Sequence, residues 1–141
     1  MRPVLPLRVG AVIGLLFAAG HSRGAPWTPG RETAAALIEQ MQALHVEVMG
    51  AQRSYWDFYF GFGLSISVSL FALALLLWQL ASLARQDAAR LRPMMLSFAA
   101  AYLAIGLVAW KFIFVLPLLF SVAIVACIAT AWVLAGRQPA P

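Results

Sequence analysis

Long apolar runs alternate with short polar segments along the chain, and four of these runs predict membrane-spanning helices. The clearest run covers residues 58–83, which include no charged residue. A straight helix needs roughly 20 residues to cross the hydrocarbon core, so this run can span it with some tilt. The remaining spans are predicted at about residues 5–21, 93–111 and 117–135.

The first apolar run has two interpretations. Its uncharged part, residues 9–20, has the length of a signal-peptide core, and the small residues at its end suit a signal peptidase. If the helix is counted from Leu5, with Arg8 reaching back toward the lipid headgroups, the same run is a short membrane span. The pattern alone therefore leaves both cleavage and retention open.

A polar, periodic segment at residues 29–49 separates the first two runs. Its apolar residues recur at steps of three and four, with charged and amide residues largely between them: Ala34, Leu37, Met41, Leu44 and Val48. This pattern predicts an amphipathic helix that is too polar to span the bilayer and lies on its surface or across the ends of the bundle. Gly50 is expected to bend the chain into the next element.

Together these elements predict an all-α membrane protein, a four-transmembrane-helix bundle in one domain of residues 1–141 with an external amphipathic helix between the first and second spans. Gly61, Ser65 and Ser69 lie at four-residue steps in the second span, and small residues let helices approach closely in lipid. We expect this face to contact another helix of the bundle or, in a homo-oligomer, a second copy of the chain. The leucine-rich second half of the span is expected to face lipid more freely.

Composition and charge agree with a membrane location. Of the 141 residues, 63% are hydrophobic and only 11% are charged, which is outside the range of soluble domains. The net charge of +5 comes from scattered basic residues that form no stripe for a phosphate backbone, so no nucleic-acid partner is expected. The loop after the second span holds three arginines and one acid. By the positive-inside rule this loop and both termini are predicted to be cytoplasmic.

Residues that could carry chemistry gather where the second span begins. Arg53 and Asp57 are four positions apart, so they would pair on one face if the helix already includes both. Tyr55, Trp56 and Tyr59 belong to an aromatic belt that either anchors the helix at the membrane surface or stacks on a flat apolar ligand. These residues are candidates for a ligand-binding site at the outer mouth of the bundle.

The two histidines, His21 and His45, are predicted on the same outer side and complete the set of ligand-binding candidates. Met41, His45 and Met49 would form a line on a helix that suits a soft ion such as Cu(I), but two histidines without a recognised spacing predict no metal site. The single Cys127 allows no intrachain disulfide. The sequence has no glycine-rich phosphate loop and no His-Glu-x-x-His motif, so no catalytic residue and no cofactor is predicted.

The stretch Arg-Ser-Tyr-Trp-Asp-Phe-Tyr-Phe-Gly-Phe-Gly at 53–63 resembles the signature of a family of small bacterial four-helix integral membrane proteins of uncharacterised function. Three further stretches resemble other parts of that family's pattern: Gly20-His21-Ser22, Leu77-Trp78-Gln79-Leu80 and Trp110-Lys111-Phe112. The resemblance implies a multi-pass protein of the bacterial inner membrane whose first helix is retained. It implies no catalytic or binding residues.

The sequence favours a non-enzymatic membrane protein that binds a lipid-like or other apolar small molecule, or a partner protein, at the mouth formed by residues 53–62. The alternative is a small membrane-embedded enzyme that uses Asp57 or His21 as an acid or base. A transporter subunit is less favoured, because no charged residue lies in the middle of a span to mark an ion path.

Overall fold

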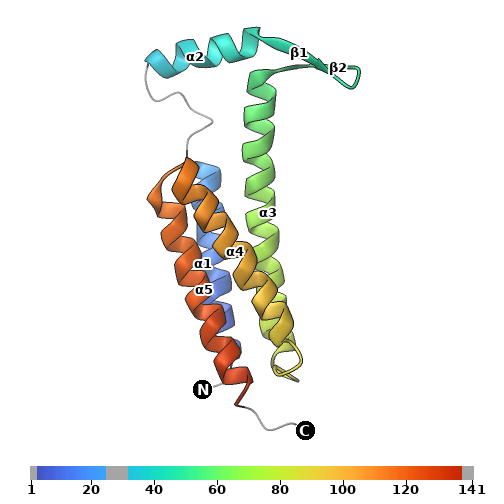
Figure 1. Cartoon of the computed structure of the whole chain (residues 1–141), viewed down its shortest axis with the longest axis vertical. Coiled ribbons are helices and arrows are strands. Elements are labelled where there is room, and N and C mark those ends of the chain that lie inside the picture. Colours follow the sequence, from blue (N-terminus) through green and yellow to red (C-terminus); the bar gives the residue numbers. More distant parts are fainter. Residues whose placement is uncertain (1–2, 25–31, 138–141) are drawn as a thin grey trace. The chain divides into compact units, whose positions relative to one another are not determined.

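The computed structural model describes residues 3–24 and 32–137. Within these ranges the chain forms five helices and one two-stranded hairpin (Figure 1), in the order α1 (Val4–Arg23), α2 (Glu32–Ala43), β1 (His45–Val48), β2 (Ala51–Ser54), α3 (Tyr55–Leu83), α4 (Arg92–Phe112) and α5 (Val115–Ala135).

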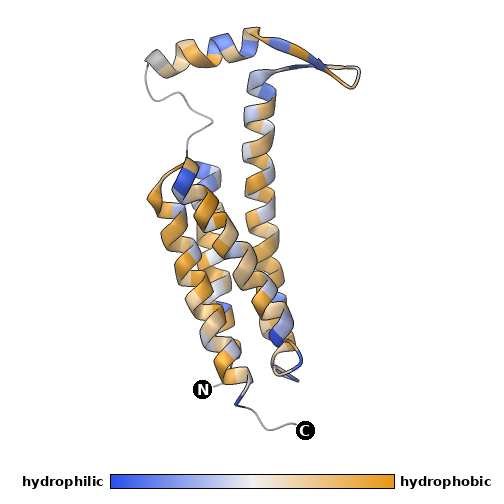
Figure 2. Ribbon diagram, viewed as in Figure 1, coloured by the Kyte–Doolittle hydropathy of each residue, from blue (hydrophilic) through white to orange (hydrophobic). Residues whose placement is uncertain are grey.

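Four of the described helices, α1, α3, α4 and α5, are long and apolar enough to cross a membrane. Hydrophobic residues dominate all four along their length (Figure 2). Large apolar side chains such as Phe71, Leu96 and Val122 are about half exposed on their outer surfaces. Apolar surface of this extent suits hydrocarbon and would be a liability in water. The predicted all-α membrane protein with four apolar spans is confirmed, and the helix ends lie within about one turn of the predicted bounds.

The chain divides into two compact units. Unit 1 comprises Met1–Phe17 and Leu70–Pro141, and unit 2 comprises Ala18–Ser69. Helices α1 and α3 each contribute residues to both units. Unit 1 holds most of the buried apolar side chains, whereas unit 2 holds all the residues that the sequence marks as ligand-binding candidates.

The core of unit 1 is built on an antiparallel pair of helices. Only Ile113 and Phe114 separate α4 from α5, and the two helices pack along each other (Figure 1). Pro117 falls in the first turn of α5, where a missing backbone N–H leaves no hydrogen bond unmade. The buried residues of α5 recur at steps of three and four: Pro117, Ser121, Ile124, Ile128, Ala131 and Ala135.

Glycines set the closest approaches between helices of unit 1. A Cβ atom added to Gly106 of α4 would lie 2.8 Å from the Cβ of Ser121 on α5. A Cβ added to Gly14 of α1 would lie 2.9 Å from the Tyr102 hydroxyl oxygen and 3.1 Å from the Cβ of Ala74. Larger residues at either glycine would push the helices apart, so these two positions fix how tightly the core closes.

The second half of α3 faces outward on one side only, whereas it was expected to face lipid more freely than the first half. Leu70, Ala74 and Leu77 in the second half are buried in the core of unit 1. In the first half, no described atom lies within 4 Å of a Cβ placed on Gly61, and the exposed Ser65 turns its hydroxyl back to the Gly61 carbonyl oxygen at 2.8 Å. The Ser65 hydroxyl is thus satisfied inside its own helix.

The predicted helix at residues 29–49 is correct only in part. Helix α2 fits the predicted external amphipathic helix, but it ends at Ala43, and His45–Val48 form strand β1 instead. The valines at 46 and 48 are β-branched and alternate with polar residues, which favours a strand over a further helical turn. Residues 29–31 of the prediction lie outside the described ranges.

The close contact between α4 and α5 leads to a first prediction. Gly106→Ala should lower the free energy of unfolding of the purified protein in detergent by about 1–3 kcal/mol, and with it the melting temperature, since the new methyl group overlaps Ser121. That cost should exceed the gain of about 1 kcal/mol in helix propensity. The matched control is Gly61→Ala, which introduces the same methyl group into open space.

A second change tests the cause of that loss. Ser121→Gly removes the atom that the new methyl group would overlap, so it should restore part of the stability when combined with Gly106→Ala. Equal melting temperatures for Gly106→Ala and Gly61→Ala would contradict the contact.

Candidate functional site

The predicted mouth of the bundle is a β-hairpin that runs directly into α3. Strands β1 and β2 pair antiparallel, with Val48 opposite Ala51 and His45 opposite Ser54. The turn residues Met49 and Gly50 both have positive φ angles, +52° and +83°, as a two-residue hairpin turn requires. Glycine adopts this conformation at no steric cost, whereas methionine does so only under the constraint of the strand pairing.

A reciprocal pair of hydrogen bonds joins the hairpin to α3. The Ser54 backbone N–H donates to the Asp57 carboxylate at 2.8 Å, and the Asp57 backbone N–H donates to the Ser54 hydroxyl oxygen at 3.1 Å. Ser54 is buried and immediately precedes the helix. This is a capping box, in which an N-cap serine and an acidic residue three positions on satisfy each other's backbone donors. The negative charge of the Asp57 carboxylate also interacts favourably with the positive end of the α3 helix dipole.

The capping box replaces the interaction expected for Arg53. The helix begins at Tyr55, so Arg53 lies in strand β2 and does not share a helical face with Asp57. Its guanidinium donates to the neighbouring Gln52 carbonyl oxygen at 3.0 Å, and its side chain is exposed. The condition for the predicted pairing, a helix that already includes Arg53 and Asp57, is therefore not met, although the Arg53 charge still acts on the Asp57 carboxylate.

The aromatic side chains form contacts along one helix. The Trp56 ring lies 5.6 Å from the Tyr59 ring and 6.3 Å from the Phe60 ring, centroid to centroid, and Phe58 lies 6.4 Å from Phe62. These are the neighbours expected at three- and four-residue steps on an α-helix. Several of them keep a large exposed fraction: Tyr55 50%, Tyr59 48% and Phe62 69%. The first two turns of α3 thus present aromatic surface outward.

The two histidines have separate partners. The His21 Nδ1 atom lies 3.0 Å from the Ser67 hydroxyl oxygen, a contact that links the end of α1 to the first half of α3. The His45 Nδ1 atom lies 3.0 Å from the Ala43 carbonyl oxygen at the start of the hairpin. His45 and Met49 lie in a strand and a turn, so they form no helical line with Met41. Within the described residues, no group of three His, Cys, Asp or Glu side chains is placed to hold a metal ion.

The chemical groups at the start of α3 are exposed aromatic rings, the polar groups beside them and one carboxylate. The exposed rings offer flat apolar surface. The polar groups closest to them in the sequence are two tyrosine hydroxyls and the Arg53 guanidinium. The Asp57 carboxylate is already used by the helix cap. Sequence reasoning missed this role, although the order Ser54-x-x-Asp57 ahead of a long apolar run is the usual signal of a capping box.

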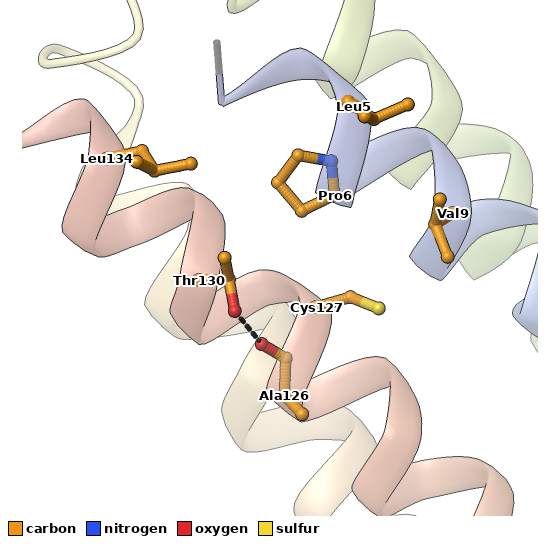
Figure 3. Close-up of a pocket in the computed structure, with 7 residues that line it drawn as sticks. All are labelled: Leu5, Pro6, Val9, Ala126, Cys127, Thr130 and Leu134. Atoms are coloured by element: carbon orange, nitrogen blue, oxygen red, sulfur yellow. Dashed lines mark hydrogen bonds between the residues drawn. The ribbon is translucent and has the colours of Figure 1, made fainter. Parts of the chain in front are cut away.

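A second feature, a shallow apolar groove of about 310 Å³, lies in unit 1 between α1 and α5 (Figure 3). None of the sequence-predicted candidates lines it. The Thr130 hydroxyl donates to the Ala126 carbonyl oxygen of its own helix at 2.8 Å, so it is not free to bond to a molecule in the groove. The lining residues are Leu5, Pro6, Val9, Ala126, Cys127, Thr130 and Leu134.

No protein-family model, curated protein or solved structure matches this chain.

The capping box gives a second prediction. Ser54→Ala should destabilise the first turn of α3 by about 1 kcal/mol, because the Asp57 backbone N–H loses its acceptor. Asp57→Ala should act in the same direction, and the double variant should cost less than the sum because the two bonds form one unit. Hydrogen–deuterium exchange of the amides at positions 55–58 measures the effect.

The control for this prediction is Arg53→Gln. It leaves both bonds of the capping box intact, so exchange at positions 55–58 should match the wild type. An Arg53→Gln variant that exchanges as fast as Asp57→Ala would show that an ion pair, and not the cap, holds this junction.

Proposed function

We propose that this protein is a non-enzymatic integral membrane protein that binds a lipid-like small molecule at the start of α3. The observation that carries the proposal is the outward aromatic surface of Tyr55, Tyr59 and Phe62, held by a helix end that the capping box fixes in place. Aromatic rings with polar tips suit molecules that have both an apolar body and a polar end.

The hairpin adds to this surface. Met49 is fully exposed at the tip of the turn, and Val48 beside it is also exposed. Exposed apolar side chains on a strand that continues into the aromatic turns extend the area on which an apolar molecule can lie. Arg53 is exposed on β2 and supplies a cation for an acidic or strongly polar end of that molecule.

The membrane and the orientation are part of the same proposal. The family resemblance supports the bacterial inner membrane and a retained first helix. Arg85 and Arg90 of the connection between α3 and α4, together with Arg92 at the start of α4, stand against one acid, Asp87, and support cytoplasmic termini. With that orientation, the hairpin and the first turns of α3 face the outside.

Native mass spectrometry of the full chain in a mild detergent tests the ligand site. Tyr55→Ala combined with Tyr59→Ala should abolish a copurifying mass that the wild-type protein retains, because it removes two of the exposed rings. The matched control is Phe112→Ala with Phe114→Ala, which removes two exposed rings, one from the end of α4 and one from the connection to α5.

The outcome separates a ligand site from a membrane anchor. Retention of the bound mass by the tyrosine variant, or its loss from both double variants, would count against a site at α3. A bound mass that proves to be a polypeptide would replace the small molecule with a partner protein.

Single cysteines test the orientation in a Cys127→Ala background. Met49→Cys at the fully exposed hairpin tip should react with an impermeant maleimide added to intact cells. Ala89→Cys, on the exposed part of the connection between α3 and α4, should react only after the cells are opened. Ala88 is unsuitable as a reporter because its side chain is buried. Labelling of position 89 in intact cells would reverse the proposed orientation.

A further inference from the structure

Two arginines of unit 1 lie over tryptophan rings. The Arg8 Cζ atom is 5.0 Å from the centre of the Trp78 ring, which joins α1 to α3. The Arg92 Cζ atom is 3.8 Å from the centre of the Trp132 ring, which joins α4 to α5. Both distances are within the range of a cation–π interaction. All four helices of the bundle therefore contribute to a pair at this end of unit 1, which we call the basic end.

Most of the positive charge at the basic end has no carboxylate partner among the described residues. Asp87 pairs with Arg90 at 3.5 Å and so is already used. Among the described residues, no carboxylate pairs with Arg8, Arg85, Arg92 or Arg137. The Nε atoms of Arg8 and Arg92 are buried and have no hydrogen-bond partner in the described part of the chain. A guanidinium stacked on a ring keeps its charge and directs its N–H donors in the plane, which suits a phosphate group.

Gly136 provides the space that the Arg92 guanidinium occupies. Gly136 has φ −73°, a backbone conformation that any residue adopts, so its glycine is not needed for the turn. A Cβ atom there would lie 3.2 Å from the Cζ atom of Arg92 and 3.3 Å from one of its terminal nitrogens. The missing side chain therefore makes room for the guanidinium beside the end of α5.

The apolar groove leads to the same end of unit 1. It lies between the first turns of α1 and the last turns of α5, and Leu134, one of its lining residues, is two positions before Gly136 (Figure 3). The groove is open along its side and offers apolar atoms to its occupant. In a membrane-spanning segment, the molecule that can fill such a groove is a hydrocarbon chain.

We propose that the basic end and the groove together bind one anionic phospholipid. Its phosphate lies at the guanidinium groups of Arg8 and Arg92, and one acyl chain lies in the groove between α1 and α5. Charge complementarity favours an anionic over a zwitterionic headgroup, because several basic groups at this end have no acidic partner in the described chain. The site is built from residues of unit 1 alone and does not depend on the proposed function of the aromatic surface of unit 2.

Lipid titration followed by native mass spectrometry tests the headgroup contact. The full chain, stripped of lipid in a mild detergent, receives equal amounts of phosphatidylglycerol and phosphatidylcholine with the same acyl chains. Wild type should retain phosphatidylglycerol preferentially. Arg8→Gln with Arg92→Gln should weaken phosphatidylglycerol binding by roughly 30-fold, or about fivefold for each arginine, and so remove the preference.

The matched control for charge is Lys111→Gln. Lys111 also lies over an aromatic ring, with its Nζ atom 5.2 Å from the centre of Phe112, but at the other end of α4. Its loss should leave the preference unchanged. The ratio of the two lipids is read from folded protein in one sample, so partial unfolding of a variant does not alter it.

Two variants of α1 test the groove. Val9 and Val12 are similarly exposed, at 44% and 45%, but only Val9 is among the residues that line the groove. Val9→Trp should fill the groove and weaken phosphatidylglycerol binding, whereas Val12→Trp should bind as wild type does. Equal binding by these two variants would overturn the assignment of the acyl chain.

Three further results would overturn the proposal. The first is equal retention of the two lipids by wild type. The second is a loss of preference in Lys111→Gln as large as in the arginine double variant. The third is displacement of phosphatidylglycerol by millimolar inorganic phosphate, which would show that the basic end recognises free phosphate and not a lipid.

Discussion

Hydrocarbon offers no hydrogen-bonding partners, so every backbone group inside the four long helices has to be satisfied within its own helix. It also removes the usual reason for apolar side chains to gather, since lipid tails are as apolar as leucine. What then holds helices together is close contact between well-fitting surfaces. In unit 1 this contact depends on Gly106 against Ser121 and on Gly14 against Ala74 and Tyr102, where one added carbon atom would separate the helices.

The spans followed from the sequence because their signal is strong and local. A run of roughly 20 apolar residues is typical of a membrane-spanning helix, and caps or charged residues mark its ends. Which face of each helix packs inward was harder. The small residues Gly61 and Ser65 suggested that one particular face of α3 packs against another helix. The buried Ala74, which lies against Gly14 of α1, is on a different face of α3. In a helix that is apolar all round, periodicity does not distinguish a lipid face from a protein face.

The hairpin and the helix cap were missed for a different reason. Apolar residues recur at steps of three and four through α2. Leu44, just after the helix, and Val48, in strand β1, continue that pattern by coincidence. If the helix that follows the bend at Gly50 already included Arg53, then Arg53 and Asp57 would share a face. The observed pairing of Val48 with Ala51 ends that assumption, and Ser54 then becomes the first residue able to cap α3.

The connection between α4 and α5 limits how unit 1 can move. Only Ile113 and Phe114 separate the two helices, and the Ile113 N–H donates to the Ala109 carbonyl oxygen at 2.8 Å, which continues the hydrogen bonding of α4 into the turn. So short a connection limits how far the adjoining helix ends can separate. The last turn of α4 and the first turn of α5 are therefore held side by side by the chain itself, without any need for side-chain contacts at this point.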